Sequence, residues 1–88
     1  MYSRDAVVMN EHGLHARPAA IFVRTANTFQ SRITLTRGGK TVNARSILEV
    51  LSLGISAGAV VSIAAEGADE KAAVDTLVRL VEQENLGQ

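Results

Sequence analysis

The chain of 88 residues is long enough to bury one hydrophobic core and too short to enclose a deep substrate or cofactor cavity as well. Nine Lys and Arg residues balance nine Asp and Glu residues, which argues against a broad basic surface for nucleic acid or an anionic membrane. There is no cysteine, no apolar run long enough to span a bilayer and no secretion signal. We therefore expect a cytoplasmic, monomeric protein without membrane insertion, metal site or cofactor.

The first predicted elements are a short strand and a helix. The strand, over residues 5–9, runs into a polar loop that ends at Gly13. A helix must begin near His15, because Pro18 lacks an N–H group and is tolerated only in the first turn of a helix. The helix extends to about Asn27, and helical spacing predicts that its core face consists of Ala19, Phe22, Val23 and Ala26, with Phe29 beyond it.

The start of this helix is the candidate reactive site. The backbone N–H groups of Ala16 and Arg17 precede the first intrahelical hydrogen bond and lie at the positive end of the helix dipole. Together with the Arg17 guanidinium, they would attract an anion and stabilise a phosphorylated form of His15. A solvated histidine without a chemical role is the alternative interpretation, and it is the usual one for a lone histidine in such a position.

A hairpin and a second helix follow. Residues 32–37 alternate in polarity, a Gly-Gly turn reverses the chain, and residues 40–43 return as the partner strand. A capping box then begins a short helix: the Ser46 hydroxyl accepts from the N–H of Glu49, and the Glu49 carboxylate accepts from the N–H of Ser46. Apolar side chains surround this helix, so we expect an exposed, protein-binding patch from some of Ile47, Leu48 and Leu51.

The last two elements complete the predicted fold. Residues 60–65 form a fourth strand, Asp69 caps a final helix, and residues 86–88 fray. The order β-α-β-β-α-β-α, without a linker, predicts one α+β domain over residues 1–88. Because three amphipathic helices exceed what a small sheet needs on both faces, we expect an open-faced two-layer sandwich, a four-stranded antiparallel sheet with three helices on one face. The core stripe of the last helix is predicted to consist of Val74, Leu77, Val78 and Val81.

The run Gly-Leu-His-Ala-Arg-Pro-Ala at residues 13–19, with Val-Asn-Ala-Arg-Ser-Ile at residues 42–47, resembles the HPr phosphocarrier family of the bacterial sugar phosphotransferase system. The resemblance extends over essentially the whole chain. It implies that His15 accepts a phosphoryl group on Nδ1 from Enzyme I, ultimately from phosphoenolpyruvate, and passes it to sugar-specific IIA domains. It also implies that Arg17 is the active-site arginine. Ser46 matches a serine that an HPr serine kinase/phosphorylase modifies in many members. That kinase and a transcriptional regulator are therefore further partners that the resemblance implies.

Two positions depart from common family patterns. His12 stands where a small polar residue is frequent, and this second imidazole would either compete with His15 for the phosphoryl group or line its pocket. Glu49 stands where members regulated at the serine often have glycine, and its charge would repel a phosphate on Ser46.

The resemblance also indicates a carrier and not an enzyme, because the partners would supply much of the alignment that phosphoryl transfer requires. The predicted docking surface has an apolar centre and a basic rim. Its candidate residues are Ala16, Ala20, Arg24, Ile47, Leu48 and Leu51.

Three alternatives stay open: a small ligand-sensing domain, a free-standing hydrolase, and a nitrogen-related or regulatory paralogue within the family. The hydrolase would need a paired acid, base or metal cluster, for which only His12 and His15 are available. Retention of His15 argues against a regulator that lacks the carrier histidine. The sequence does not identify the sugars that are served, the acceptors, or a serine kinase in the host.

Overall fold

The structure is a computed structural model, and it describes residues 1–87. Residue 88, which the sequence predicts to fray, lies outside the described residues. Seven elements follow one another in the predicted order. They are β1 (Tyr2–Val7), α1 (Ala16–Ala26), β2 (Arg32–Arg37), β3 (Lys40–Asn43), α2 (Ile47–Ser52), β4 (Val60–Glu66) and α3 (Glu70–Val81).

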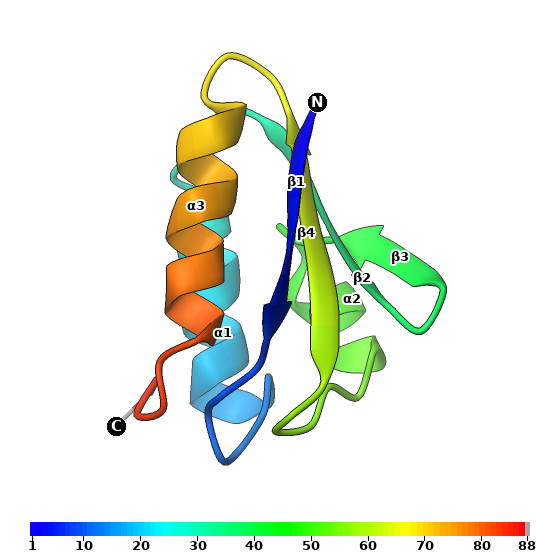
Figure 1. The fold of residues 1–88 in the computed structure, drawn as a ribbon, viewed down its shortest axis with the longest axis vertical. Helices are drawn as coiled ribbons and strands as arrows, with labels where there is room; N and C mark the ends of the chain where they lie inside the picture. The colour runs from blue at the N-terminus through cyan, green and yellow to red at the C-terminus, as the bar shows by residue number, and fades with distance from the viewer. Residues whose placement is uncertain (88) are drawn as a thin grey trace.

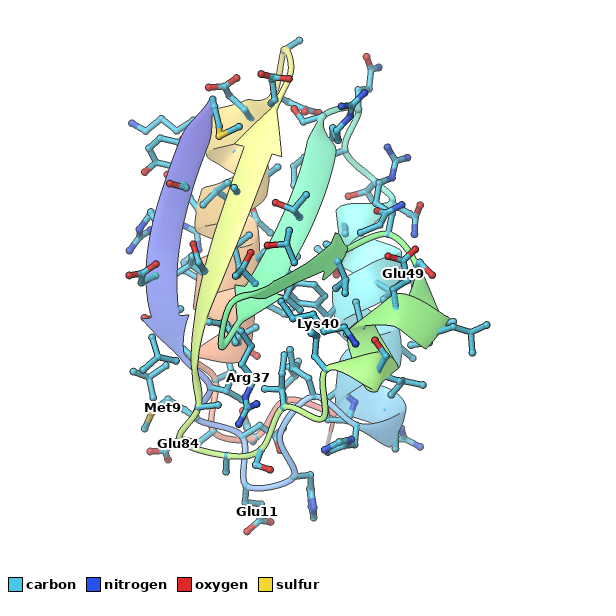
Figure 2. The ribbon with its side chains drawn as sticks, turned by 90° about the vertical axis from the view of Figure 1, so that its right-hand side faces the viewer. Met9, Glu11, Arg37, Lys40, Glu49 and Glu84 are labelled. Atoms are coloured by element: carbon cyan, nitrogen blue, oxygen red, sulfur yellow. The ribbon has the colours of Figure 1, made fainter. Side chains whose placement is uncertain are left out.

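The strands form one antiparallel sheet in the order β1-β4-β2-β3. The last strand along the chain, β4, is therefore inserted between β1 and β2. Helices α1 and α3 pack behind this sheet, and α2 follows β3 at its edge, while the opposite face stays open (Figures 1 and 2). The predicted open-faced sandwich with three helices on one side is thus confirmed.

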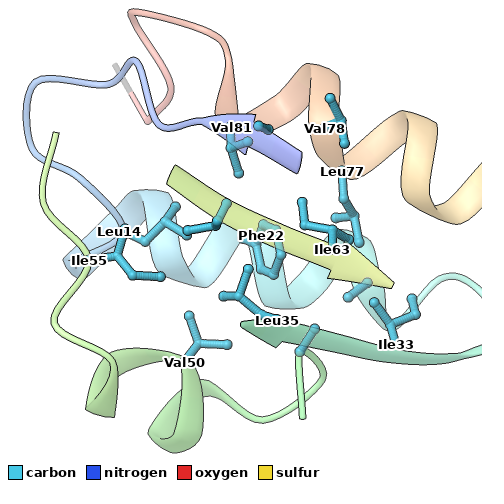
Figure 3. Close-up of a cluster of buried hydrophobic side chains, with 14 of the residues drawn as sticks. Leu14, Phe22, Ile33, Leu35, Val50, Ile55, Ile63, Leu77, Val78 and Val81 are labelled. Carbon is cyan, nitrogen blue, oxygen red and sulfur yellow. The ribbon is translucent and has the colours of Figure 1, made fainter. Parts of the chain in front are cut away.

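The core lies between the sheet and the helices. Alternate residues of the central strands, such as Leu35 in β2 and Ile63 in β4, point inward and are fully buried. Phe22 of α1 meets them in the middle of the layer (Figure 3). Each such side chain stabilises the fold by about 1.5–3 kcal/mol relative to an exposed one. All four residues of the predicted α3 stripe are buried, whereas Val23 in α1 is only partly buried.

The first strand lies nearer the N-terminus than predicted, at Tyr2–Val7 instead of residues 5–9. The reason is tertiary: Tyr2 pairs with Ala65 of β4, and its hydroxyl donates to the Asp75 carboxylate of α3 at 2.9 Å. The chain then leaves the sheet, because the N–H of Met9 donates to the Val81 carbonyl oxygen of α3 at 3.0 Å. Polar residues at an edge strand face solvent, so the sequence of β1 lacks the apolar pattern of a central strand.

Asp69 occupies the N-cap position of α3, but its side chain makes no capping hydrogen bond, and this prediction is wrong. The carboxylate instead accepts from the backbone N–H groups of Gln30 and Ser31, each at 2.9 Å, and from the Ser31 hydroxyl. These hydrogen bonds hold the pKa of Asp69 below its ordinary value, and the bond from the Ser31 hydroxyl contributes most. Their contribution to stability is therefore present at neutral pH and is lost as the pH falls through the folded-state pKa.

Candidate functional site

The loop before His15 is held in place by its contacts with Ile55. Leu14 is fully buried beside Ile55, and its N–H donates to the Ile55 carbonyl oxygen at 3.0 Å (Figure 3). Gly13 has a φ of +66°, and a Cβ there would lie 2.2 Å from the same oxygen. Only glycine combines this backbone conformation with so close an approach. The buried leucine and the glycine together deliver the next residue, His15, to the surface.

The first helix begins in an irregular way at this point. His15 has an extended backbone (φ −124°, ψ 160°), and its side chain makes no capping hydrogen bond. Ala16, the first residue of α1, has a φ of +50°. A non-glycine residue in this left-handed region costs about 1–3 kcal/mol and is typical of functional sites. The sequence predicts regular helix geometry at the helix start, and Ala16 departs from it.

The two predicted backbone donors are free within the described chain. Among residues 1–87, the N–H groups of Ala16 and Arg17 donate to no other residue. The next residue, Pro18, is buried and has no N–H group, as the sequence predicts for a first helical turn. Two unpaired N–H groups at a helix start are suited to an anion.

A pocket of about 420 Å³ opens at this helix start. Within the described part of the chain, its walls contain no carboxylate, so its charged groups favour an anion. Its lining residues are His12, His15, Ala16, Arg17, Pro18, Leu86 and Gly87. His12 therefore shares the pocket with His15, although its Nε2 faces the Glu11 carboxylate at 3.5 Å.

The C-terminal segment forms one wall of this pocket, which the sequence did not indicate. Residues 86–88 are predicted to fray, but Leu86 is only 4% exposed. Its carbonyl oxygen accepts from the side-chain amide of Asn10. The carbonyl oxygen of Gly87 in turn accepts from the Arg17 guanidinium at 3.4 Å. For residues 86 and 87 the prediction is thus wrong, because tertiary contacts hold a segment that has no regular structure of its own.

The start of α2 differs from the predicted capping box in one of its two bonds. The Ser46 hydroxyl accepts from the N–H of Glu49 at 3.4 Å, as predicted. The Glu49 carboxylate, however, accepts from the N–H of Asn43 at 3.0 Å and not from that of Ser46. The N–H of Ser46 is already taken by the Asn43 carbonyl oxygen at 3.2 Å. The tight turn after β3 therefore redirects the glutamate.

Apolar side chains of α2 are exposed, as the sequence predicts. Leu48 is 78% exposed, and Ile47 and Leu51 are exposed at 37% and 36%. Helices α1 and α2 contact each other, and α1 adds Ala16 and Arg24, which are exposed, and Ala20, which is partly buried. We call the six residues, Ala16, Ala20, Arg24, Ile47, Leu48 and Leu51, the α1–α2 surface. A binding role for this surface stays a prediction.

Within residues 1–87, no group of three or more His, Cys, Asp or Glu side chains is placed to hold a metal ion. None of the helices in that range is long and apolar enough to cross a membrane.

Comparison with known proteins gives a consistent result. The family model for the PTS HPr component phosphorylation site matches residues 2–83. The phosphocarrier protein HPr of Haemophilus influenzae is 44% identical over 81 residues, which cover 92% of this chain and 95% of that protein. A crystal structure of HPr from Thermoanaerobacter tengcongensis superposes with a TM-score of 0.91 at 49% identity and covers 93% of this chain and 92% of that one. A crystal structure described as an HPr dimer from the same organism gives a TM-score of 0.74 at 54% identity, with 80% of each chain covered.

Proposed function

The chain belongs to the HPr family of phosphocarrier proteins, and we propose that it carries the phosphoryl group on His15, between Enzyme I and sugar-specific IIA domains. The observation that supports this proposal is the pocket at the start of α1. There an exposed imidazole and a guanidinium meet two backbone N–H groups that have no partner within residues 1–87, and no side-chain carboxylate of those residues lines the pocket.

The proposed step is a nucleophilic displacement at phosphorus. The electron pair on Nδ1 of neutral His15 forms the new N–P bond, while the bond between phosphorus and the donor breaks and its electrons leave with the donor. His15 must therefore carry its proton on Nε2. In the second step, a histidine of the acceptor attacks the same phosphorus and the N–P bond to His15 breaks. The protein is thus the phosphoryl acceptor in one partner's active site and the phosphoryl donor in the next, so we assign it the role of a carrier and not of an enzyme.

Arg17 and the helix start would stabilise the transferred group. The Arg17 guanidinium lies at the edge of the pocket, where its contact to the Gly87 carbonyl oxygen is long, at 3.4 Å. A phosphate dianion would be a stronger acceptor than a neutral carbonyl. The free N–H groups of Ala16 and Arg17 offer further hydrogen bonds to phosphate oxygens. His12 lines the same pocket and is the other imidazole, from which the phosphoryl group would have to be excluded.

We assign docking of Enzyme I and the IIA domains to the α1–α2 surface. It joins exposed leucine and isoleucine side chains to α1, the helix that follows His15, with Arg24 at its rim. An apolar centre with a basic rim is complementary to a partner groove with an acidic rim. A partner that docked here would have the phosphoryl pocket at the edge of its interface.

Leu48→Glu tests this docking surface. The variant should raise the KM for this protein in the Enzyme I reaction about tenfold or more, because it places a charge at an apolar contact, and should leave the melting temperature unchanged. Val60→Glu is the matched control, since Val60 is also exposed, at 59%, but lies on β4. Equal effects of the two variants on KM would contradict the assignment of the surface.

Regulation at Ser46 is a second part of the proposal. Ser46 is the N-cap of α2 and adjoins Ile47 and Leu48, so a phosphate from an ATP-dependent kinase would add negative charge at the edge of the α1–α2 surface. The N–H groups at the start of α2 would tolerate that charge. An HPr serine kinase/phosphorylase would add this phosphate, and a transcriptional regulator would be a partner of the modified protein.

Phosphorylation with site mapping tests the proposed function. The protein is incubated with Enzyme I and phosphoenolpyruvate, and mass spectrometry locates the phosphoryl group. We expect one phosphoryl group on His15 and none on His12. Labelling on His12 alone, or no labelling, would refute the carrier role of His15. A reaction fed by phosphoenolpyruvate belongs in the cytoplasm, and we propose that location, with residues 1–88 acting as a single monomeric domain; a dimer by light scattering would correct the last point.

A further inference from the structure

Asn10 is a buried polar residue that the proposed reaction does not use. It lies in the loop between β1 and His15, and its side chain is 0% exposed. Both ends of its amide are bonded. The NH₂ group donates to the Leu86 carbonyl oxygen, and Oδ1 accepts from the backbone N–H of His12 at 2.8 Å. Breaking either bond would leave a buried polar group unpaired, so the amide fixes two segments that are distant in sequence.

The hydrogen bond from the Asn10 amide to Leu86 connects Asn10 indirectly to Arg17. Leu86 is buried, and the next residue, Gly87, packs on the first turn of α1, where a Cβ on Gly87 would lie 3.1 Å from Cδ of Pro18. The Gly87 carbonyl oxygen accepts from the Arg17 guanidinium at 3.4 Å. Because Leu86 and Gly87 are adjacent, the Asn10 bond holds the segment that contacts Arg17.

The other end leads to the loop in front of His15. The side-chain Oδ1 of Asn10 accepts from the N–H of His12, and the backbone carbonyl oxygen of Asn10 accepts from the N–H of Gly13 at 3.0 Å. Gly13 in turn sits against Ile55, with no room for a side chain. Asn10 thus joins the two segments that contribute His12, Leu86 and Gly87 to the walls of the pocket.

We propose that Asn10 is a positioning residue for the phosphoryl site: its amide tethers residues 86 and 87 to the loop before α1, and this holds the Gly87 carbonyl oxygen that keeps the Arg17 side chain at the edge of the His15 pocket. The consequence for phosphoryl transfer rests on the proposed function, whereas the tether itself is measurable in the unphosphorylated protein. Asn10 touches no reacting atom. Its loss should leave the nucleophile and the α1–α2 surface intact and reduce only the preorganisation of Arg17.

The test compares Asn10→Ala and Asn10→Asp in the full chain. The alanine variant loses both side-chain bonds, while the aspartate variant keeps an acceptor for the His12 N–H and loses the donor to Leu86. In both variants, the Arg17 Nε–H and Gly87 amide resonances should move toward the shifts of a mobile segment, with lower heteronuclear NOE values. The matched control is Asn85→Ala, at an exposed asparagine next to Leu86, which should reproduce the parent spectrum.

The kinetic arm separates positioning from folding. With Enzyme I as donor, the Asn10 variants should lose about three- to tenfold in kcat while KM stays within about twofold of the parent, because Arg17 is less well oriented and docking is unchanged. Parent-like Arg17 and Gly87 resonances in folded Asn10→Asp would overturn the proposal, even if Asn10→Ala fails to fold. If the parent accepts no phosphoryl group on His15, the proposed function fails, and the resonances still decide whether the tether exists.

Discussion

The starts of α1 and α2 differ in how their backbone donors are satisfied. At α2 the Ser46 hydroxyl accepts from the N–H of Glu49, and the Ser46 carbonyl oxygen accepts from the N–H of Val50 at 3.0 Å. At α1 the equivalent residue is His15, whose side chain makes no capping bond, and the next residue, Ala16, has a positive φ. The start of α2 thus has a side-chain cap on one of its donors and is called the closed start, whereas the start of α1 has no side-chain cap and is called the open start.

This difference separates stability from function. A capped helix start contributes to the free energy of folding, whereas an open one leaves its donors for a ligand. The free-energy cost of the uncapped start of α1 is offset by two neighbouring contacts. Leu14 is buried in the core just before it, and Gly87, next to buried Leu86, bonds to Arg17 in its first turn. Substitutions at the two starts should therefore affect different measurements.

His15→Ala should give the largest effect, the complete loss of phosphoryl acceptance from Enzyme I. Because His15 is exposed and caps nothing, the free energy of unfolding should stay within about 0.5 kcal/mol of the parent. Labelling with phosphoenolpyruvate and a urea denaturation curve measure the two quantities. Full labelling of the variant would show that the open helix start is not the reactive one.

Arg17→Ala should come next, with a decrease of about 10- to 100-fold in the rates of both acceptance and donation, since a hydrogen bond to a charged group is worth about 1.5–3 kcal/mol. Rapid-quench measurements in both directions test this. Arg32→Ala is the matched control, because Arg32 is also exposed but lies at the start of β2. Equal effects of the two variants would indicate a general charge effect and not a role for Arg17 in the pocket.

Gly13→Ala tests whether the close contact of Gly13 with Ile55 supports the loop before the open start of α1. The added Cβ would overlap the Ile55 carbonyl oxygen, so we expect a loss of about 2–4 kcal/mol in the free energy of unfolding. The control is Gly54→Ala. Gly54 has a similar φ of +59°, but an added Cβ there would meet no atom of a non-neighbouring residue within 4 Å, so this variant should lose only about 1–2 kcal/mol in the free energy of unfolding. Denaturation curves that gave equal losses would mean that the close approach to Ile55 does not support the loop.

Ser46→Asp should give the smallest effect and probes the closed start. Aspartate also caps a helix, so the melting temperature should stay close to that of the parent. The added charge should raise the KM in the Enzyme I reaction about two- to fivefold at low ionic strength, and salt should abolish the effect. An unaltered KM at low salt would mean that the start of α2 lies outside the docking surface and that Ser46 is only a cap.

The sequence predicted the features that local rules determine. Pro18 placed the start of α1, glycine spacing gave the hairpin between β2 and β3, and helical periodicity gave the α3 stripe. It failed where a tertiary partner competes with a local one. Asp69 binds the loop at Ser31 instead of capping α3, and Glu49 binds the N–H of Asn43 instead of that of Ser46.

The same limit applies to the candidate site. His15, Arg17 and the free N–H groups follow from one short motif, and the structure brings them together around one pocket. No local pattern predicts the positive φ of Ala16. The wall formed by Leu86 and Gly87 could not be predicted either, because it depends on contacts between segments about 70 residues apart, such as that of Arg17 with Gly87. A polar residue at position 10, directly after the apolar run of residues 6–9, was the available signal for the buried amide.

The open start of α1 is tested most directly by NMR of the protein phosphorylated with Enzyme I and phosphoenolpyruvate, using ¹⁵N-labelled chain. The account predicts that the phosphoryl group is on Nδ1 of His15 and that the amide protons of Ala16 and Arg17 shift downfield as they bind phosphate oxygens, while the amide of Glu49 at the closed start of α2 does not move. A phosphoryl group on His12, or unshifted amides at Ala16 and Arg17, would contradict it.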